Sequence, residues 1–363
     1  MGSPTVIKFP SYAKLAFVLI SLIIIFTIVY LGQNVLVPLV LSLLFAILLR
    51  PVAAFLNRKL RFPHVIAVLV SVILLVILVA GIVLLVSWQI ADMTEDWNKI
   101  KTNLSNHFHH AQQWVKTKLN ISYIKQKNYL EHIKQETLKS DSQIMGDTLN
   151  SFTGTLLSIV LIPVYTFLIL LYRTLFVKFL YEIVAKKNWP ALQDILCQVR
   201  NVVQSYLVGL MTEMALVATM TTIGFMIIGI EYAMLLGLIT GILNLIPYIG
   251  ILMAGLISIL ATLGSSGEIS LIIGIIVTNS IVQLIDNNFI VPKIVGNKVQ
   301  INALVTMVGV IAGGTIAGVP GMILSIPLIA IMKVIFDHAA PLKPYGMLMG
   351  NSVPEKYTPP STT

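Results

Sequence analysis

Charged residues are scarce in this chain. Asp, Glu, Lys and Arg make up 11% of its 363 residues, whereas 57% are hydrophobic. Soluble domains carry about a quarter charged residues, so the composition excludes an ordinary soluble protein. The single cysteine, Cys197, excludes an intramolecular disulfide and a cysteine-based metal site. The sequence also lacks HExxH, GxSxG and P-loop motifs, so it predicts neither an enzyme nor an ATP-driven pump.

Long apolar runs accompany this scarcity of charge. Six of them reach or approach the roughly 20 residues that cross a bilayer core. These runs are Leu15–Leu31, Val35–Leu56, Val65–Trp88, Phe152–Tyr172, Tyr206–Ile230 and Ile269–Val291. Transmembrane barrels would show short alternating strands instead. The predicted fold class is therefore an all-α, polytopic integral membrane protein, with about eight membrane segments once two broken runs are added.

Basic residues beside the runs set the predicted topology. Lys8 and Lys14 precede the first run, and Arg50 and Arg61 bracket the loop after the second, so these regions are expected in the cytoplasm. Residues 89–151 then lie outside, and their apolar spacing predicts a small amphipathic helical domain. The net charge of +9 reflects such flanking positions and contacts with anionic headgroups of the lipid bilayer, so we expect no nucleic-acid partner.

The topology divides the chain into five parts. These are spans one to three (1–88), the external segment (89–151), the fourth span with a cytoplasmic linker (152–205), a transport core (206–336) and a tail (337–363). Both termini are expected in the cytoplasm. The external segment includes His107, His109 and His110, but their spacing suits one helical face poorly, so we expect no metal site and no cofactor.

Two apolar stretches, 232–263 and 301–336, are too long for single spans. The first would reach about 48 Å as one helix, whereas the bilayer core is about 30 Å thick. Helix-breaking or polar residues interrupt the first stretch at Asn244, Pro247, Tyr248 and Gly250. The second is interrupted at Gly313, Gly314, Gly318, Pro320 and Gly321.

Two topologies fit these stretches. As single spans they place the loop with Lys293 and Lys298 outside, and as re-entrant hairpins they place it inside, which the positive-inside rule favours. The hairpins would give two span-plus-hairpin units of inverted topology, an arrangement found in transporters with binding near the midplane. Kinked helices packed on their neighbours remain the simpler alternative.

Polar residues at membrane depth are the candidate site. Asn244 can bond backbone groups that the break at Pro247 frees, or a solute. Glu213 lies within the fifth span, where a carboxylate is costly. It is either a coupling group for a proton or cation, or a group near the interface that reaches water. Asp286, Asn287 and Asn288 either cap a helix end or offer oxygens to a hydroxylated solute or a cation.

Several of these segments resemble the autoinducer-2 exporter family. The resemblance rests on "LNLIPYIG" at 243–250 and on Val291–Lys333, with "PKIVG" at 292–296, "GVPG" at 318–321 and "IPL" at 326–328. It implies a bacterial inner-membrane secondary transporter that forms homo-oligomers, with a pentamer as one arrangement. Family members are described as exporters of autoinducer-2 or as sodium or lithium/proton antiporters. One departure is Leu210, where members often carry Gln after the Tyr-Leu-x-Gly motif.

These observations together predict a secondary transporter that exports a small polar, autoinducer-2-like solute by alternating access, in an elevator-like manner. A cation/proton antiporter using Glu213 and Asp286 is the first alternative. A non-transporting membrane scaffold, whose external helices bind a partner, is a second, and a channel is a third. No enzymatic activity is expected.

Overall fold

The computed structural model describes residues 10–119, 160–247, 249–266, 268–294 and 301–351. Within these ranges the secondary structure is helical, with no strand. The N-terminal helices are α1 (Ser11–Leu31), α2 (Gln33–Arg58), α3 (His64–Glu95) and α4 (Trp97–Leu119). A helix at Val160–Leu171, α7 (Arg173–Ile183), α8 (Trp189–Ile227), α9 (Ala233–Leu243) and α10 (Ile249–Ser265) follow. The C-terminal elements are α11 (Ile269–Ile285), α12 (Val291–Ile294), α13 (Ala303–His338) and α14 (Lys343–Met349).

Five described helices are long and apolar enough to cross a membrane, if α13, which folds back on itself, is counted as one. The residues Val160–Leu171 and Arg173–Ile183, bent by 62°, add a sixth span if they are counted as one. Large apolar side chains are exposed along α1, α3 and α11, as expected for surfaces that face lipid. These features support a multi-pass membrane protein, whereas the number of about eight segments stays a prediction.

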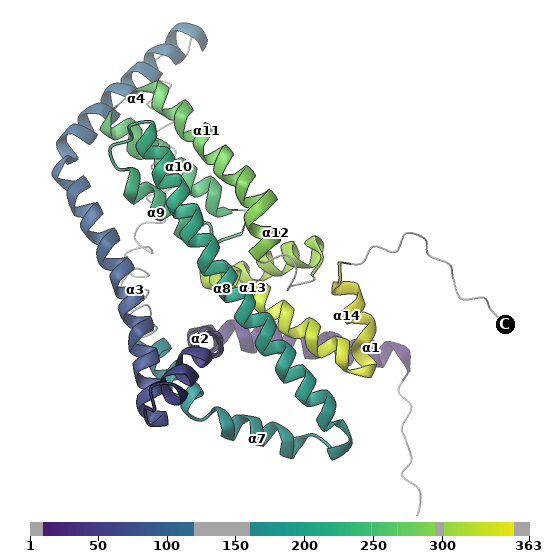
Figure 1. Cartoon of the computed structure of the whole chain (residues 1–363). Coiled ribbons are helices and arrows are strands. Elements are labelled where there is room, and N and C mark those ends of the chain that lie inside the picture. Colours follow the sequence, from purple (N-terminus) through teal and green to yellow (C-terminus); the bar gives the residue numbers. More distant parts are fainter. Residues whose placement is uncertain (1–9, 120–159, 248, 267, 295–300, 352–363) are drawn as a thin grey trace, which may run out of the picture.

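Helix α8 is the longest element of the core. It begins at Trp189, with Pro190 in its first turn, where the missing N–H of proline costs no helical bond. It continues without a break to Ile227, so the division expected at residues 205 and 206 falls inside one helix. Helix α11 packs antiparallel to α8, because Gly224 approaches Thr278 and Ile228 approaches Gly274 (Figure 1).

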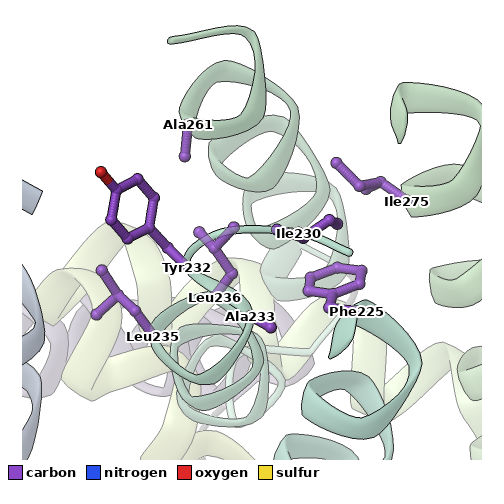
Figure 2. Close-up of a cluster of buried hydrophobic side chains, with 8 residues drawn as sticks. All are labelled: Phe225, Ile230, Tyr232, Ala233, Leu235, Leu236, Ala261 and Ile275. Carbon is purple, nitrogen blue, oxygen red and sulfur yellow. The ribbon is translucent and has the colours of Figure 1, made fainter. Parts of the chain in front are cut away.

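A buried apolar cluster joins the ends of α8, α9, α10 and α11. Figure 2 shows its eight side chains, Phe225, Ile230, Tyr232, Ala233, Leu235, Leu236, Ala261 and Ile275. Burying this apolar surface holds the α9–α10 pair against α8 and α11, through close packing rather than hydrophobic exclusion alone.

Helices α9 and α10 form a broken pair whose two outer ends meet the same helix. Tyr232, just before α9, donates a hydrogen bond to Asp96 at the start of α4 (2.8 Å), and Lys99 pairs with Glu231 (2.9 Å). At the far end of α10, the Asn103 amide donates to the carbonyl oxygens of Gly264 and Ser265 (3.0 and 3.1 Å). The α9–α10 pair therefore begins and ends beside α4. The break between α9 and α10 lies at the opposite end of the pair.

Helix α13 also folds back on itself. Ala317 and Gly318 leave helical geometry, and Gly318 has φ +59° and ψ −143°, a region essentially restricted to glycine. On either side of this turn, Ser325 donates a hydrogen bond to the Gly309 carbonyl (2.8 Å), and Gly313 lies against Gly321. These contacts pair the residues before the turn with those after it, so α13 consists of two antiparallel halves.

Candidate functional site

Three polar side chains from separate elements meet inside the helix bundle. The Asn244 amide donates a hydrogen bond to Glu213 Oε1 (3.0 Å), although 31 residues separate them in the chain. Asn244 also lies beside the carboxyl group of Asp286, and the two carboxyl groups are close enough to interact electrostatically. Glu213 is 9% exposed and Asp286 is 2% exposed. We refer to Glu213, Asn244 and Asp286 as the acidic cluster.

Local helix geometry explains why these side chains point inward. Glu213, Val217 and Thr221 recur every four residues on the buried face of α8, which also contacts α9 and α11. Asn244 is the residue immediately after α9, at its C-terminal cap. Asp286 begins a five-residue π-helical segment, Asp286–Ile290, that continues α11. Such wide turns are rare and are frequently found at functional sites.

One fully buried oxygen of the acidic cluster lacks a hydrogen-bond partner among the described residues. Asp286 Oδ1 is buried and accepts no hydrogen bond within the described residues. The oxygens of four other buried side chains share this property: Thr221, Ser258, Thr262 and Asn279. A buried oxygen without a donor is costly, so these atoms are available to a proton, a cation or a solute hydroxyl. Across the described residues, no three His, Cys, Asp or Glu side chains gather into a metal site.

The break between α9 and α10 depends on Pro247 and Gly250. Residues after Leu243 form turns instead of helix, and the Leu243 carbonyl accepts a hydrogen bond from Ile246 N–H (2.8 Å). A Cβ atom on Gly250 would lie 1.8 Å from that carbonyl oxygen, so only glycine lets α10 start so close to the end of α9. Tyr248, the remaining candidate in this break, lies outside the described residues.

An apolar groove of about 570 Å³ lies between α10 and α11. Three polar residues of α11 line it, Asn279, Ser280 and Gln283, together with Asn287 in the π-helical segment that follows. Gln283 donates a hydrogen bond to Asn287 Oδ1 (3.0 Å). A mostly apolar surface with a few convergent polar groups is typical of sites for small ligands.

The other candidate residues lie apart from the acidic cluster. Asn287 is exposed in the groove, while Asn288 is exposed and donates to the carbonyl of Leu284 in its own helix (2.8 Å). The five candidates of α13 form its turn and the contact between its halves. These are Gly313, Gly314, Gly318, Pro320 and Gly321. In the described part of the chain, no hydrogen bond links their side chains or backbone to the acidic cluster.

Sequence reasoning missed Asn279 and Gln283. Both precede Asn287 at four-residue intervals, so the three form a polar stripe along one face of an apolar helix. That spacing was the available signal. Asp286 lies on a neighbouring face with Asn279 and Val282, where α11 is buried.

Comparisons with known proteins match this chain to transport proteins. The family model described as "AI-2E family transporter" matches residues 19–340. The protein YrrI of Bacillus subtilis, named a putative transport protein, is 25% identical over 84% of this chain and 87% of its own length. The Escherichia coli protein named AI-2 transport protein TqsA is 23% identical over 90% of this chain and 92% of its own length.

Proposed function

Because the chain belongs to the AI-2E transporter family, we propose that it is a secondary transporter that exports a small polar, autoinducer-2-like solute. The name of the TqsA relative supports this choice of solute. The proposal includes a bacterial inner-membrane location with both termini in the cytoplasm, and a homo-oligomeric assembly. The acidic cluster is the observation that carries it, because buried carboxyl groups in membrane helices mark ion and substrate pathways.

The acidic cluster provides a coupling step. Two carboxyl groups and one amide share a small buried volume, so adding or removing a proton or a cation changes the local charge in a low-dielectric region. Such a change biases a conformational equilibrium only if the two states bind the ion differently. Asn244 lies at the break between α9 and α10, so a movement of this break alters the contact with Glu213.

The groove between α10 and α11 provides the proposed solute site. Its apolar walls suit a small furanone-derived ring, and Asn279, Gln283 and Asn287 offer hydrogen bonds to hydroxyl groups. Asn279 links the two sites, since it lines the groove and shares a buried face of α11 with Asp286.

We propose that alternating access moves two re-entrant hairpins, the α9–α10 pair and α13. The return of the α9–α10 pair to α4 supports the first hairpin, and the antiparallel halves of α13 support the second. An introduced cysteine tests the topology of the first hairpin, in a variant that lacks the native thiol of Cys197. We expect Glu268→Cys, in a Cys197→Ser background, to react with an impermeant maleimide added outside intact cells. Reaction only after the inner face is exposed would contradict the re-entrant topology.

Uptake of autoinducer-2 into everted vesicles tests the function. We expect Asn244→Leu to lower the uptake rate at least tenfold at an unchanged protein level, since a buried carboxylate loses its hydrogen-bond donor, which is worth about 1.5–3 kcal/mol. Asn98→Leu, at an exposed position of α4, is the matched control and should transport as the wild type does. Equal uptake by the two variants would contradict the assignment of the acidic cluster.

Sodium or lithium/proton antiport is the second candidate function. The unpartnered Asp286 Oδ1 favours it, because carboxylate and amide oxygens are ligands for hard cations. In proteoliposomes containing a pH-sensitive dye, sodium should release protons through the wild type but not through Glu213→Gln. Proton movement that survives in Glu213→Gln would exclude coupling through this residue.

A further inference from the structure

A second cavity, of about 260 Å³, lies between α2, α3, α7 and α8. It differs from the groove because its lining is strongly basic. Four arginines line it, two from α2 and one each from α7 and α8, together with His64 at the start of α3 and Asn57. The arginines are Arg50, Arg58, Arg173 and Arg200.

The four arginines bring like charges together. Arg50 has the other three guanidinium groups as electrostatic neighbours. In the part of the chain that the structure describes, none of the four forms an ion pair with a carboxylate. Like charges held together repel one another, and the repulsion increases where the groups are withdrawn from water. An anion between the guanidinium groups would relieve this repulsion.

Arg200 provides the clearest sign of a missing acceptor. Its Nε atom is buried and has no hydrogen-bond partner within the described residues. An N–H group that is removed from water without an acceptor is destabilising. Arg200 lines the cavity, so an acceptor bound there would satisfy this donor.

The beginning of α3 adds to the positive potential. His64 is the first residue of this 32-residue helix, and no side chain caps its N-terminus. The free N–H groups of a first turn and the helix dipole both favour an anion. Asn57 is held in place because its amide donates to the Phe62 carbonyl (2.8 Å).

We propose that this cavity binds a phosphate group. The planar guanidinium fork matches the geometry of phosphate oxygens and forms paired, charge-assisted hydrogen bonds. A phosphate satisfies the N–H donors of several arginines better than a single carboxylate does, because it offers more acceptor oxygens. The group is carried either by an anionic phospholipid headgroup or by a soluble phosphate compound.

The phosphate site is separate from the transport sites. Arg200 precedes Glu213 by thirteen residues on α8, which corresponds to about 20 Å along the helix. The bound anion bridges the α2–α3 pair and the beginning of α8, and so it joins the N-terminal helices to the helix that carries Glu213. Loss of the anion should weaken this junction without altering the acidic cluster.

Binding to the purified, delipidated full chain tests the proposal. Native mass spectrometry and thermal shift are measured with phosphatidylglycerol, with phosphatidylcholine and with inorganic phosphate. We expect the wild type to bind phosphatidylglycerol or phosphate, and Arg200→Gln and Arg173→Gln to weaken that binding at least tenfold. Lys59→Gln removes one charge from an exposed neighbouring position and should change binding less than twofold.

The possible outcomes distinguish a lipid headgroup from a soluble phosphate compound, and distinguish both from failure of the proposal. Binding of phosphatidylglycerol over phosphatidylcholine, with no response to phosphate, identifies a lipid headgroup, and a response to inorganic phosphate identifies a soluble compound. Arg200→Lys keeps the charge without the planar fork, so it should bind more weakly than the wild type but better than Arg200→Gln. Equal binding by Arg200→Gln and Lys59→Gln would overturn the proposal, as would a wild type that binds none of these ligands.

Discussion

The tight contact between the two halves of α13 gives a prediction with an unusual sign. A Cβ atom at position 321 would lie 2.0 Å from the Gly313 carbonyl oxygen, whereas real Cβ atoms keep at least 3.0 Å from such neighbours. The halves would have to separate by about 1 Å, and the hydrogen bond from Ser325 to Gly309 would be strained. Overpacking of this kind costs about 1–3 kcal/mol.

In a continuous, straight helix the same change would act in the opposite direction. Replacing glycine by alanine inside a helix stabilises it by up to about 1 kcal/mol. Gly81 in α3 provides the control, since no atom lies within 4 Å of its Cβ position. The sign of the stability change at position 321 therefore distinguishes a folded-back α13 from a straight one.

Thermal unfolding of the purified protein in detergent measures this difference. At roughly 2–4 °C for each kcal/mol, we expect Gly321→Ala to lower the apparent Tm by about 2–12 °C. Gly81→Ala should leave it unchanged or raise it slightly. If Gly321→Ala is as stable as Gly81→Ala, the two halves of α13 do not pack against each other and the reasoning is wrong.

Three further predictions concern helix ends and the turn of α13. Asn103→Ala should lower the apparent Tm, because two carbonyl groups at the end of α10 lose their donor. Ser105→Ala, at an exposed position, should not lower it. Equal Tm changes in the two variants would show that Asn103 does not stabilise the end of α10. The hydrogen bond to Glu231 raises the pKa of Lys99 above its ordinary value of 10.5. The stabilising effect of this ion pair is therefore complete below pH 10.5 and is lost only as the pH rises through the raised pKa. Lys99→Gln should therefore change stability by the same small amount throughout about pH 6–9, and a marked pH dependence in this range would contradict the assignment. Gly318→Ala should lower the Tm although no atom blocks the Cβ, because its φ of +59° strains any other residue, and an unchanged Tm would place the turn elsewhere.

The sequence predicted the class of the fold and the individual polar residues of the acidic cluster. It singled out Glu213 by its cost in an apolar segment and Asn244 by its place beside a helix break. Asp286 was singled out as the first of three carboxylate or amide residues that close the next span. It did not predict the hydrogen bond between Glu213 and Asn244. That contact depends on the angle at which α9 returns against α8, which side-chain packing around Phe225 and Leu236 determines and which no local pattern encodes.

Glycines in α13 show a second limit of sequence reasoning. Four of them, Gly313, Gly314, Gly318 and Gly321, read as helix breakers, yet only Gly318 adopts a positive φ in the turn. Gly313 and Gly321 instead allow two helical halves to approach, and this depends on a partner segment that the sequence does not identify. The first turns of α8 are more polar, with Gln193, Asp194 and Arg200, yet the helix continues through them into the apolar run.

The attachment of both ends of the α9–α10 pair to α4 has a mechanical consequence. Asp96, Lys99 and Asn103 lie at intervals of three and four residues, so one face of α4 holds the pair at both ends. A rigid displacement of α9–α10 must either break all of these contacts or carry α4 with it. In the second case the hinge is the junction at Asp96, where α3 ends and α4 begins, and the boundary between the fixed and moving parts of the molecule lies outside the transport core.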